Sequence, residues 1–229
     1  MNSEPTRGFL RNSRYLKAQP EVSPGFSDYS MFNSGGVEGE VGEFLYGFVR
    51  LTKPDCILET GTHRGISTLY MAAALKENAK GHIWTLEIFD ENIKASRALW
   101  RDTGVDSFAT CLKQDSLSYR PEGMFDILFL DSEPQYRFDE FVNFYPHLKP
   151  GGFIFIHDLH PNLGLSDVVV NGMRNWPYGD FREKFGEHIL DHSLQTFSFF
   201  TPRGFTVFQK TAPDFNQTLF LRGEKVING

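Results

Sequence analysis

Acidic side chains stand at the ends of five largely apolar segments of this sequence. The five acids are Glu59, Glu87, Asp115, Asp131 and Asp158. Segments of this kind predict β-strands that are buried in a parallel sheet. In a doubly wound sheet the carboxyl ends of the strands line one edge, so we expect the five carboxylates along that edge. Such a row is costly unless a positively charged or hydroxyl-rich ligand binds beside it.

The first of these acids precedes a short loop that contains two glycines. Gly61 and Gly65 have no Cβ, so a ligand can lie against the backbone there. The segment that follows Gly65 is a good helix former, and the first amides of a helix suit a carboxylate or phosphate. The spacing is G-x-x-x-G, which differs from the G-x-G-x-x-G of dinucleotide-binding loops. Glu59, the acid before the loop, favours a ligand with a positive group, such as the amino group of S-adenosylmethionine (SAM). The alternative is an ordinary βα turn without a ligand.

Each acid along the edge has an expected partner on such a ligand. Glu59 would face the α-amino group, Glu87 would accept hydrogen bonds from the ribose, and Asp115 would face the adenine amino group. Any one of them alone could be a solvated strand end or a helix cap, and it is their joint pattern that predicts a nucleoside cofactor. The candidate cofactor-binding residues are Glu59, Gly61, Thr62, Gly65, Ser67, Glu87, Ile88, Asp115, Ser116 and Asp131.

The elements that must position these residues alternate between helices and strands. Apolar periodicity predicts helices over 37–51, 66–77, 90–103 and 138–148, and strands over 56–59, 82–87, 108–112, 125–131 and 153–158. We expect Gly81 to cap the second helix and Lys149-Pro150-Gly151-Gly152 to end the fourth. Residues 195–200 and 204–210 carry a hairpin signal, and 166–175 predicts a further helix. The fold class is therefore α/β, with a Rossmann-like doubly wound sheet.

Composition narrows the choice of partners. The chain has 229 residues and a net charge of −6, and it shows no basic stripe, so nucleic acid is not an expected partner. It lacks an apolar leader and a run of about 18 apolar residues, from which we expect a cytoplasmic protein that does not enter a membrane. We divide it into an arm (1–36), a main domain (37–210) and a tail (211–229). Aromatic residues in the arm suggest that it packs on the body, on the ligand, or on a partner in a homodimer; a floppy leader is the alternative.

Three segments resemble the class I SAM-dependent methyltransferases. They are residues 58–67 (LETGTHRGIS), 129–132 (FLDS) and 148–158 (LKPGGFIFIHD). Within that class the chain is most similar to the small O-methyltransferase branch, which includes the catechol and caffeoyl-CoA type and the cephalosporin-biosynthesis and macrolide-sugar methyltransferases. The resemblance implies a seven-stranded sheet with an antiparallel C-terminal strand, SAM as cofactor, and O-methylation of a small-molecule or sugar hydroxyl.

The resemblance also implies a divalent metal, usually Mg²⁺, held by Asp131 and Asp158. A third ligand could come from His157, His160 or Glu133, and a histidine ligand would point to manganese, iron or zinc instead. The match weakens beyond the two acids, because Leu159 stands where catechol-type enzymes have Asn. His157 likewise stands where related members have an acid.

Without a metal, His157 or His160 would act as the general base, since histidine titrates near neutrality. His157 could also be a strand-end residue that hydrogen-bonds a carbonyl. The candidate catalytic residues are thus His157, Asp131 and His160, and aromatic residues of 15–32 and 160–178 are candidate walls for the acceptor. Two rival functions stay open at this point: a nicotinamide-dependent oxidoreductase and a non-catalytic protein with a SAM-binding fold.

Overall fold

The structure is a computed structural model that describes residues 21–23, 26–31, 36–159, 194–199, 201 and 203–211. Its seven-stranded sheet has the strand order β5-β4-β3-β6-β7-β9-β8, and a separate two-stranded sheet pairs β1 with β2. The large sheet is mostly parallel, with antiparallel strands at its C-terminal end, as the sequence predicts. The chain forms two compact units, residues 1–119 and 120–229. We describe each unit by itself.

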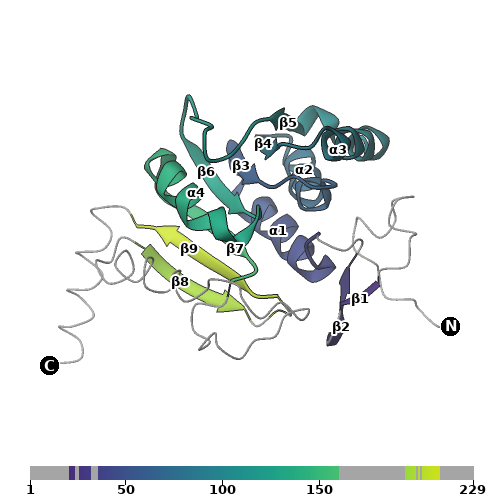
Figure 1. Cartoon of the computed structure of the whole chain (residues 1–229), viewed down its shortest axis with the longest axis horizontal. Coiled ribbons are helices and arrows are strands. Elements are labelled where there is room, and N and C mark those ends of the chain that lie inside the picture. The colour runs from purple at the N-terminus through teal and green to yellow at the C-terminus, as the bar shows by residue number, and fades with distance from the viewer. Residues whose placement is uncertain are drawn as a thin grey trace, which may run out of the picture. The chain divides into compact units, whose positions relative to one another are not determined.

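The first unit contains a parallel βαβ arrangement preceded by a hairpin. Its elements are β1 (Glu21–Ser23), β2 (Phe26–Met31), α1 (Gly39–Thr52), β3 (Cys56–Thr60), α2 (Ile66–Asn78), β4 (His82–Glu87), α3 (Asp90–Thr103), a 3-10 turn (Asp106–Phe108) and β5 (Ala109–Lys113). Strand β4 pairs in parallel with both β3 and β5. Helix α2 is buried from Ser67 to Leu75 and packs on α1, which explains why it is apolar on all sides (Figure 1). The hairpin gives a defined structure to part of the segment that we expected to form an arm.

The second unit pairs two parallel strands with an antiparallel hairpin. Its elements are β6 (Phe125–Leu130), a 3-10 turn (Pro134–Tyr136), α4 (Arg137–Phe144), a second 3-10 turn (Tyr145–His147), β7 (Leu148–His157), β8 (Leu194–Phe199) and β9 (Phe205–Lys210). Strand β6 runs parallel to β7, while β9 lies antiparallel to β7 and to β8. Helix α4 packs against β6 (Figure 1). The core of this unit is rich in phenylalanine, including Phe129, Phe155 and Phe205.

Two of the expected element ends were wrong. Helix α4 ends at Phe144, and the segment Lys149-Pro150-Gly151-Gly152 belongs to β7, which begins at Leu148. Leu148 pairs with Phe125 of β6, and the register of the two strands shifts just beyond that pair. Pairing with β6 thus outweighs the tendency of proline and glycine to end a strand or helix. The second helix is capped by Ala79 in a left-handed conformation, not by Gly81. Gly81 is required for a different reason, because a Cβ there would lie 2.2 Å from the Pro54 carbonyl oxygen.

Several expectations fall outside the described residues. They concern His160, the helix predicted at 166–175, the aromatic residues of 160–178, most of the aromatic arm and the end of the tail. Among the residues that are described, no helix has both the length and the apolar character needed to span a bilayer.

Candidate functional site: a glycine loop and an acid cluster

The loop between β3 and α2 is shaped by three residues with positive φ. Gly61 and Gly65 both have φ of 78°, and His63 has φ of 47°. A side chain at Gly65 would collide with its surroundings, because a Cβ would lie 2.7 Å from both Ser96 Cβ and Trp100 Nε1. Trp100 also donates a hydrogen bond of 3.0 Å to the Gly65 carbonyl oxygen. The second glycine is therefore dictated by both backbone conformation and packing.

Glu59 lies beneath this loop and has no exposed surface. Its carboxylate accepts hydrogen bonds from the hydroxyl groups of Ser67, at 2.5 Å, and Thr68, both in the first turn of α2. The carboxylate thus lies at a helix N-terminus, where negative charge is favourable. Thr62 is also buried and its hydroxyl pairs with that of Thr85 at 2.7 Å. The predicted contact of Glu59 with an amino group stays a prediction.

Glu87 anchors the same loop from the end of β4. Its Oε2 accepts hydrogen bonds from the His63 amide at 2.8 Å and from Asn92 Nδ2 at 3.2 Å. Its Oε1 accepts from the amides of Ile88, at 2.8 Å, and Phe89, at 3.0 Å. A carboxylate has about four lone-pair positions, so these four donors satisfy it. Glu87 therefore ties the turn after β3 to the turn after β4.

The remaining predicted cofactor residues of the first unit lie in more open positions. Asp115 is exposed and accepts a hydrogen bond from the Leu117 amide at 2.9 Å, which forms a local turn after β5. Ser116 beside it is partly buried. Ile88 and Phe89 follow β4 with 53% and 55% of their surface exposed, so they present an apolar surface next to the Glu87 carboxylate. The exposed Phe89 was not among the residues that sequence reasoning selected.

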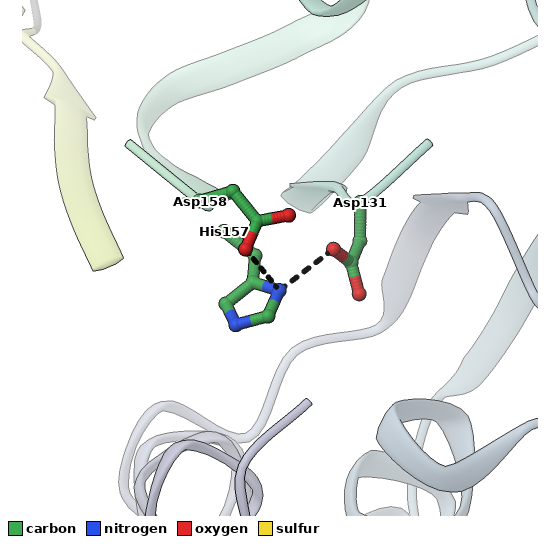
Figure 2. Close-up of side chains that lie close together, drawn as sticks. All are labelled: Asp131, His157 and Asp158. Atoms are coloured by element: carbon green, nitrogen blue, oxygen red, sulfur yellow. Dashed lines mark hydrogen bonds and ion pairs between the residues drawn. The ribbon is translucent and has the colours of Figure 1, made fainter. Parts of the chain in front are cut away.

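In the second unit, β6 and β7 bring three of the predicted residues together (Figure 2). Asp131 follows the end of β6, His157 is the last residue of β7, and Asp158 comes directly after it. His157 Nδ1 lies 2.9 Å from Asp131 Oδ1 and 3.6 Å from Asp158 Oδ1, so the ring faces both carboxylates. The His157 side chain has no exposed surface, whereas 10% of the Asp131 side chain is exposed. Asp131 is therefore the more accessible member of the pair.

Asp158 is buried and paired with two arginines. Its Oδ2 lies 3.1 Å from Arg137 Nη2 and 2.9 Å from Arg203 Nη2, and its Oδ1 lies 2.6 Å from Arg203 Nε. Burial alone would raise the pKa of this carboxyl. Electrostatic attraction to His157, Arg137 and Arg203 outweighs burial and lowers the pKa from 3.8 to about 2. Asp158 is thus held as a carboxylate, and its φ of 59° places it in a left-handed turn whose amide donates to the Gly204 carbonyl oxygen at 2.8 Å.

Arg137 connects most of this cluster. Its side chain is 4% exposed and donates to the carbonyl oxygens of Ser132 and His157 as well as to Asp158. Its Nη2 also lies 3.5 Å from Asp131 Oδ1. Sequence reasoning missed both Arg137 and Arg203. Arg137 offered one signal, because it is the first residue of a helix, where a positive charge is unfavourable unless a partner elsewhere compensates it.

The cluster of Asp131, His157 and Asp158 has the spacing of a metal site but not its charge. One ligand atom from each residue lies within 4.8 Å of the others. Arg137 and Arg203, however, already balance the two carboxylates, and an arginine does not lose its proton in a protein. A positive charge about 4 Å from a guanidinium is repelled by about 4 kcal/mol per unit charge at an effective dielectric constant of about 20. The charges carry more weight than the spacing, so the residues present do not fit a divalent cation. Glu133, a candidate third ligand, is exposed and lies outside this group of three.

Comparison with known proteins shows which proteins this chain is similar to. Residues 58–159 match a family described as a methyltransferase domain. A relative from Mycobacterium sp. (strain JLS), provisionally named an O-methyltransferase, is 27% identical over 142 residues, which are 60% of this chain and 64% of the relative. The match thus spans less than two thirds of that relative.

Solved structures agree with this result. A provisionally named O-methyltransferase from Klebsiella pneumoniae is 26% identical with a TM-score of 0.65, over 79% of this chain and 84% of that one. An O-methyltransferase from Bacillus cereus, solved in complex with SAH, has the same fold at 22% identity, with a TM-score of 0.63 over 78% of this chain and 84% of that one.

Proposed function

We propose that this chain is a SAM-dependent O-methyltransferase, like the proteins it is similar to, and that it transfers the methyl group of SAM to a hydroxyl of a small molecule or sugar. The two sets of acids described above support this proposal. In the first unit they are satisfied by neutral donors, which suits a cationic cofactor. In the second unit the Asp131 carboxylate lies 2.9 Å from His157 Nδ1 and is the more accessible side chain of that pair.

The glycine loop and the two buried glutamates would bind the cofactor. The amides at the start of α2 suit the carboxylate of the methionine part. The Glu59 and Glu87 side chains accept hydrogen bonds from hydroxyl and amide donors, and a carboxylate at these positions would attract the amino and sulfonium groups of SAM. A ribose hydroxyl that bonds Glu87 would replace Asn92, which makes the longest of its four hydrogen bonds. The exposed Ile88 and Phe89 would lie against the adenine, with Asp115 and Ser116 at its polar edge.

The acceptor half of the proposal rests on one observation, the Asp131–His157 pair. His157 Nδ1 and Asp131 Oδ1 are 2.9 Å apart and only Asp131 has any exposed side-chain surface, so an acceptor that reaches the pair meets Asp131. As the acceptor oxygen attacks the methyl carbon, its proton would move to the Asp131 carboxylate and the sulfonium would become a neutral thioether. His157, with its Nδ1–H toward Asp131, would hold that carboxylate in place. The sulfonium is already activated, so most of the remaining catalysis is alignment and exclusion of water.

The first test of this function is ligand binding. Calorimetry on the full chain should show binding of SAM and SAH but not of NAD. This result would distinguish a methyltransferase from a nicotinamide-dependent oxidoreductase. Labelled SAM should then transfer its methyl group to a member of a panel of dihydroxyphenyl compounds and sugars, which would exclude a non-catalytic protein. Absence of SAM and SAH binding would overturn the proposal.

The second test removes the proton acceptor. Asp131→Asn should lower kcat by about 10² to 10⁴-fold, because general-base catalysis contributes that much. SAH affinity should stay unchanged, since the role assigned to Asp131 concerns the acceptor. Asp139→Asn is a matched control, because Asp139 is an exposed acid on α4. Equal turnover in the two variants would contradict the role of Asp131.

A further inference from the structure

We propose that Arg137 and Arg203 take the electrostatic place of a divalent metal, so that the acid cluster of the second unit works without one. This inference rests on the proposed function and concerns how the same cluster is organised. It assigns Arg137 as a positioning residue for Asp131 and His157. It also predicts that removal of the two guanidiniums turns the cluster into a metal site.

The first step is a balance of charge. Two carboxylates, Asp131 and Asp158, would match the two charges of a divalent cation. Here both oxygens of Asp158 lie between 2.6 and 3.1 Å from arginine nitrogen atoms, and its side chain is only 4% exposed. Oδ2 accepts a hydrogen bond from each arginine, whereas Oδ1 accepts none and lies against the Arg203 charge as an ion pair. A metal at either oxygen would therefore have to displace or face a guanidinium.

The second step is a comparison of what a cation and a guanidinium can hold. A metal would draw together the oxygens of its ligands. Arg137 does this with directed hydrogen bonds, because its nitrogens donate to the Ser132 and His157 carbonyl oxygens and to Asp158. These three acceptors follow or end β6 and β7, the strands that carry Asp131 and His157. The planar fork of arginine suits this task better than a point charge would.

The third step concerns Arg203, which reaches the cluster from the connection between β8 and β9. Arg203 makes two contacts with the Asp158 carboxylate. A third interaction between the same segments is the hydrogen bond of 2.8 Å from the Asp158 amide to the Gly204 carbonyl oxygen. The hairpin connection is thus fastened to the residue after β7. Arg203 supplies the second positive charge that completes the balance, with 16% of its side chain exposed.

The decisive experiment titrates Mn²⁺ and Mg²⁺ into the full chain by calorimetry. We expect no binding by the unaltered protein at millimolar metal. The Arg137→Met, Arg203→Met double variant should bind Mn²⁺ with a Kd at least on the order of a hundredfold below the millimolar concentration at which the unaltered protein shows no binding, because the repulsion is gone and Asp158 is released. Arg137→Lys with Arg203→Lys keeps the charges and should remain without metal.

The controls separate this inference from the proposed function. Arg50→Met removes an arginine that pairs with Glu77 in the first unit and should gain no metal affinity. SAH binding by each variant reports on its fold and cofactor site. If neither the unaltered protein nor any variant binds SAH, that result counts against the proposed function alone. If the double variant does not fold, Arg203→Met is titrated instead, since Arg203 is the less buried of the two.

Two results would overturn the inference. One is Mn²⁺ or Mg²⁺ binding by the unaltered protein that Asp158→Asn abolishes. The other is a folded double variant, with normal SAH affinity, that gains no affinity for either metal.

A kinetic readout distinguishes positioning from mere stability once an acceptor is known. Arg137→Met should lower kcat at an unchanged SAM affinity, and Arg137→Lys should restore part of the loss. Addition of a chelator should leave turnover of the unaltered protein unchanged, and a loss of turnover that Mg²⁺ reverses would contradict the inference.

Discussion

Buried carboxylates occur in both units of this protein, but they are stabilised in opposite ways. Glu87 in the first unit accepts its hydrogen bonds from backbone amides and an asparagine. Asp158 in the second unit is surrounded by two guanidinium groups. Glu87 accepts hydrogen bonds at both oxygens, whereas Asp158 accepts them only at Oδ2 and holds Oδ1 by its ion pair with Arg203. The difference that matters for binding is in net charge, which the neutral donors leave in place and the arginines cancel.

This difference indicates what each region can bind. A carboxylate that is held by dipoles still attracts a cation, as a cofactor with a sulfonium group requires. A carboxylate that is held by arginine is fixed in position but no longer recruits a cation. The resemblance to metal-assisted enzymes treats the acids at the strand ends as equivalent, whereas their neighbours make them different.

The strongest test of this contrast is Asp158→Asn. The change leaves Arg137 and Arg203 next to a neutral amide, and Arg137 is almost fully buried. Breaking one partner of a buried ion pair costs about 3–5 kcal/mol, so we expect the free energy of unfolding to fall by that amount. Urea denaturation at pH 7 measures this decrease. A decrease of less than about 1 kcal/mol would show that groups other than Asp158 compensate the charges of the two arginines.

The same residue should make the stability of the protein depend on acid. The pKa of Asp158 is about 2 in the folded chain against 3.8 without its partners, so its contribution is complete above the higher value and is lost as the pH falls toward 2. That contribution is on the order of 2 kcal/mol. The difference in free energy of unfolding between the unaltered protein and Asp158→Asn should therefore narrow as the pH falls from 6 to 3, which denaturation curves across this range measure.

A smaller effect is expected from Glu87→Gln in the first unit. The side chain keeps its shape, but its amide nitrogen would face backbone N–H donors that now bond an oxygen. Leaving such donors unsatisfied costs about 1–3 kcal/mol of unfolding free energy. Because the negative charge is also lost, SAM affinity should fall roughly tenfold, which calorimetry can measure. Unchanged affinity would mean that charge at this position does not assist cofactor binding.

The smallest effect should come from an exposed ion pair. Lys113 Nζ lies 2.6 Å from Asp90 Oδ2, with side chains 59% and 77% exposed. Exposed pairs contribute about 0–1 kcal/mol, so Lys113→Met should change the urea midpoint very little. A large change would show that burial is not what separates Asp158 from other paired acids.

The sequence predicted the strands of the first unit well because their signals are local. The strand 82–87 and the helix 90–103 were predicted with the bounds that the structure has, since apolar runs and the glycine at 104 mark them. The beginning of β7 was missed because Pro150 and two glycines outweighed a pairing with β6 that only the folded chain reveals. The turn residue Ala79 was missed because alanine seldom adopts a positive φ.

For the site, the sequence identified the acids but not their partners. The proximity of Asp131, His157 and Asp158 follows from parallel strands that end at the same edge. The long side chains of Arg137 and Arg203 approach these acids from a helix start and a hairpin connection, and no spacing rule relates those positions to the strand ends. The charge balance of the cluster, and with it the fit to a metal, could not be read from the order of residues.

The indole of Trp100 has a practical consequence for anyone who studies this protein in solution. It is almost fully buried and bonded through Nε1 to the Gly65 carbonyl oxygen, at the junction of the glycine turn and α2. In a variant whose other two tryptophans, Trp84 and Trp176, are replaced by phenylalanine, its fluorescence would report the state of the turn without an added dye. Emission should shift when SAH is added if the ligand moves Gly65, which gives a continuous optical readout for the variants described above.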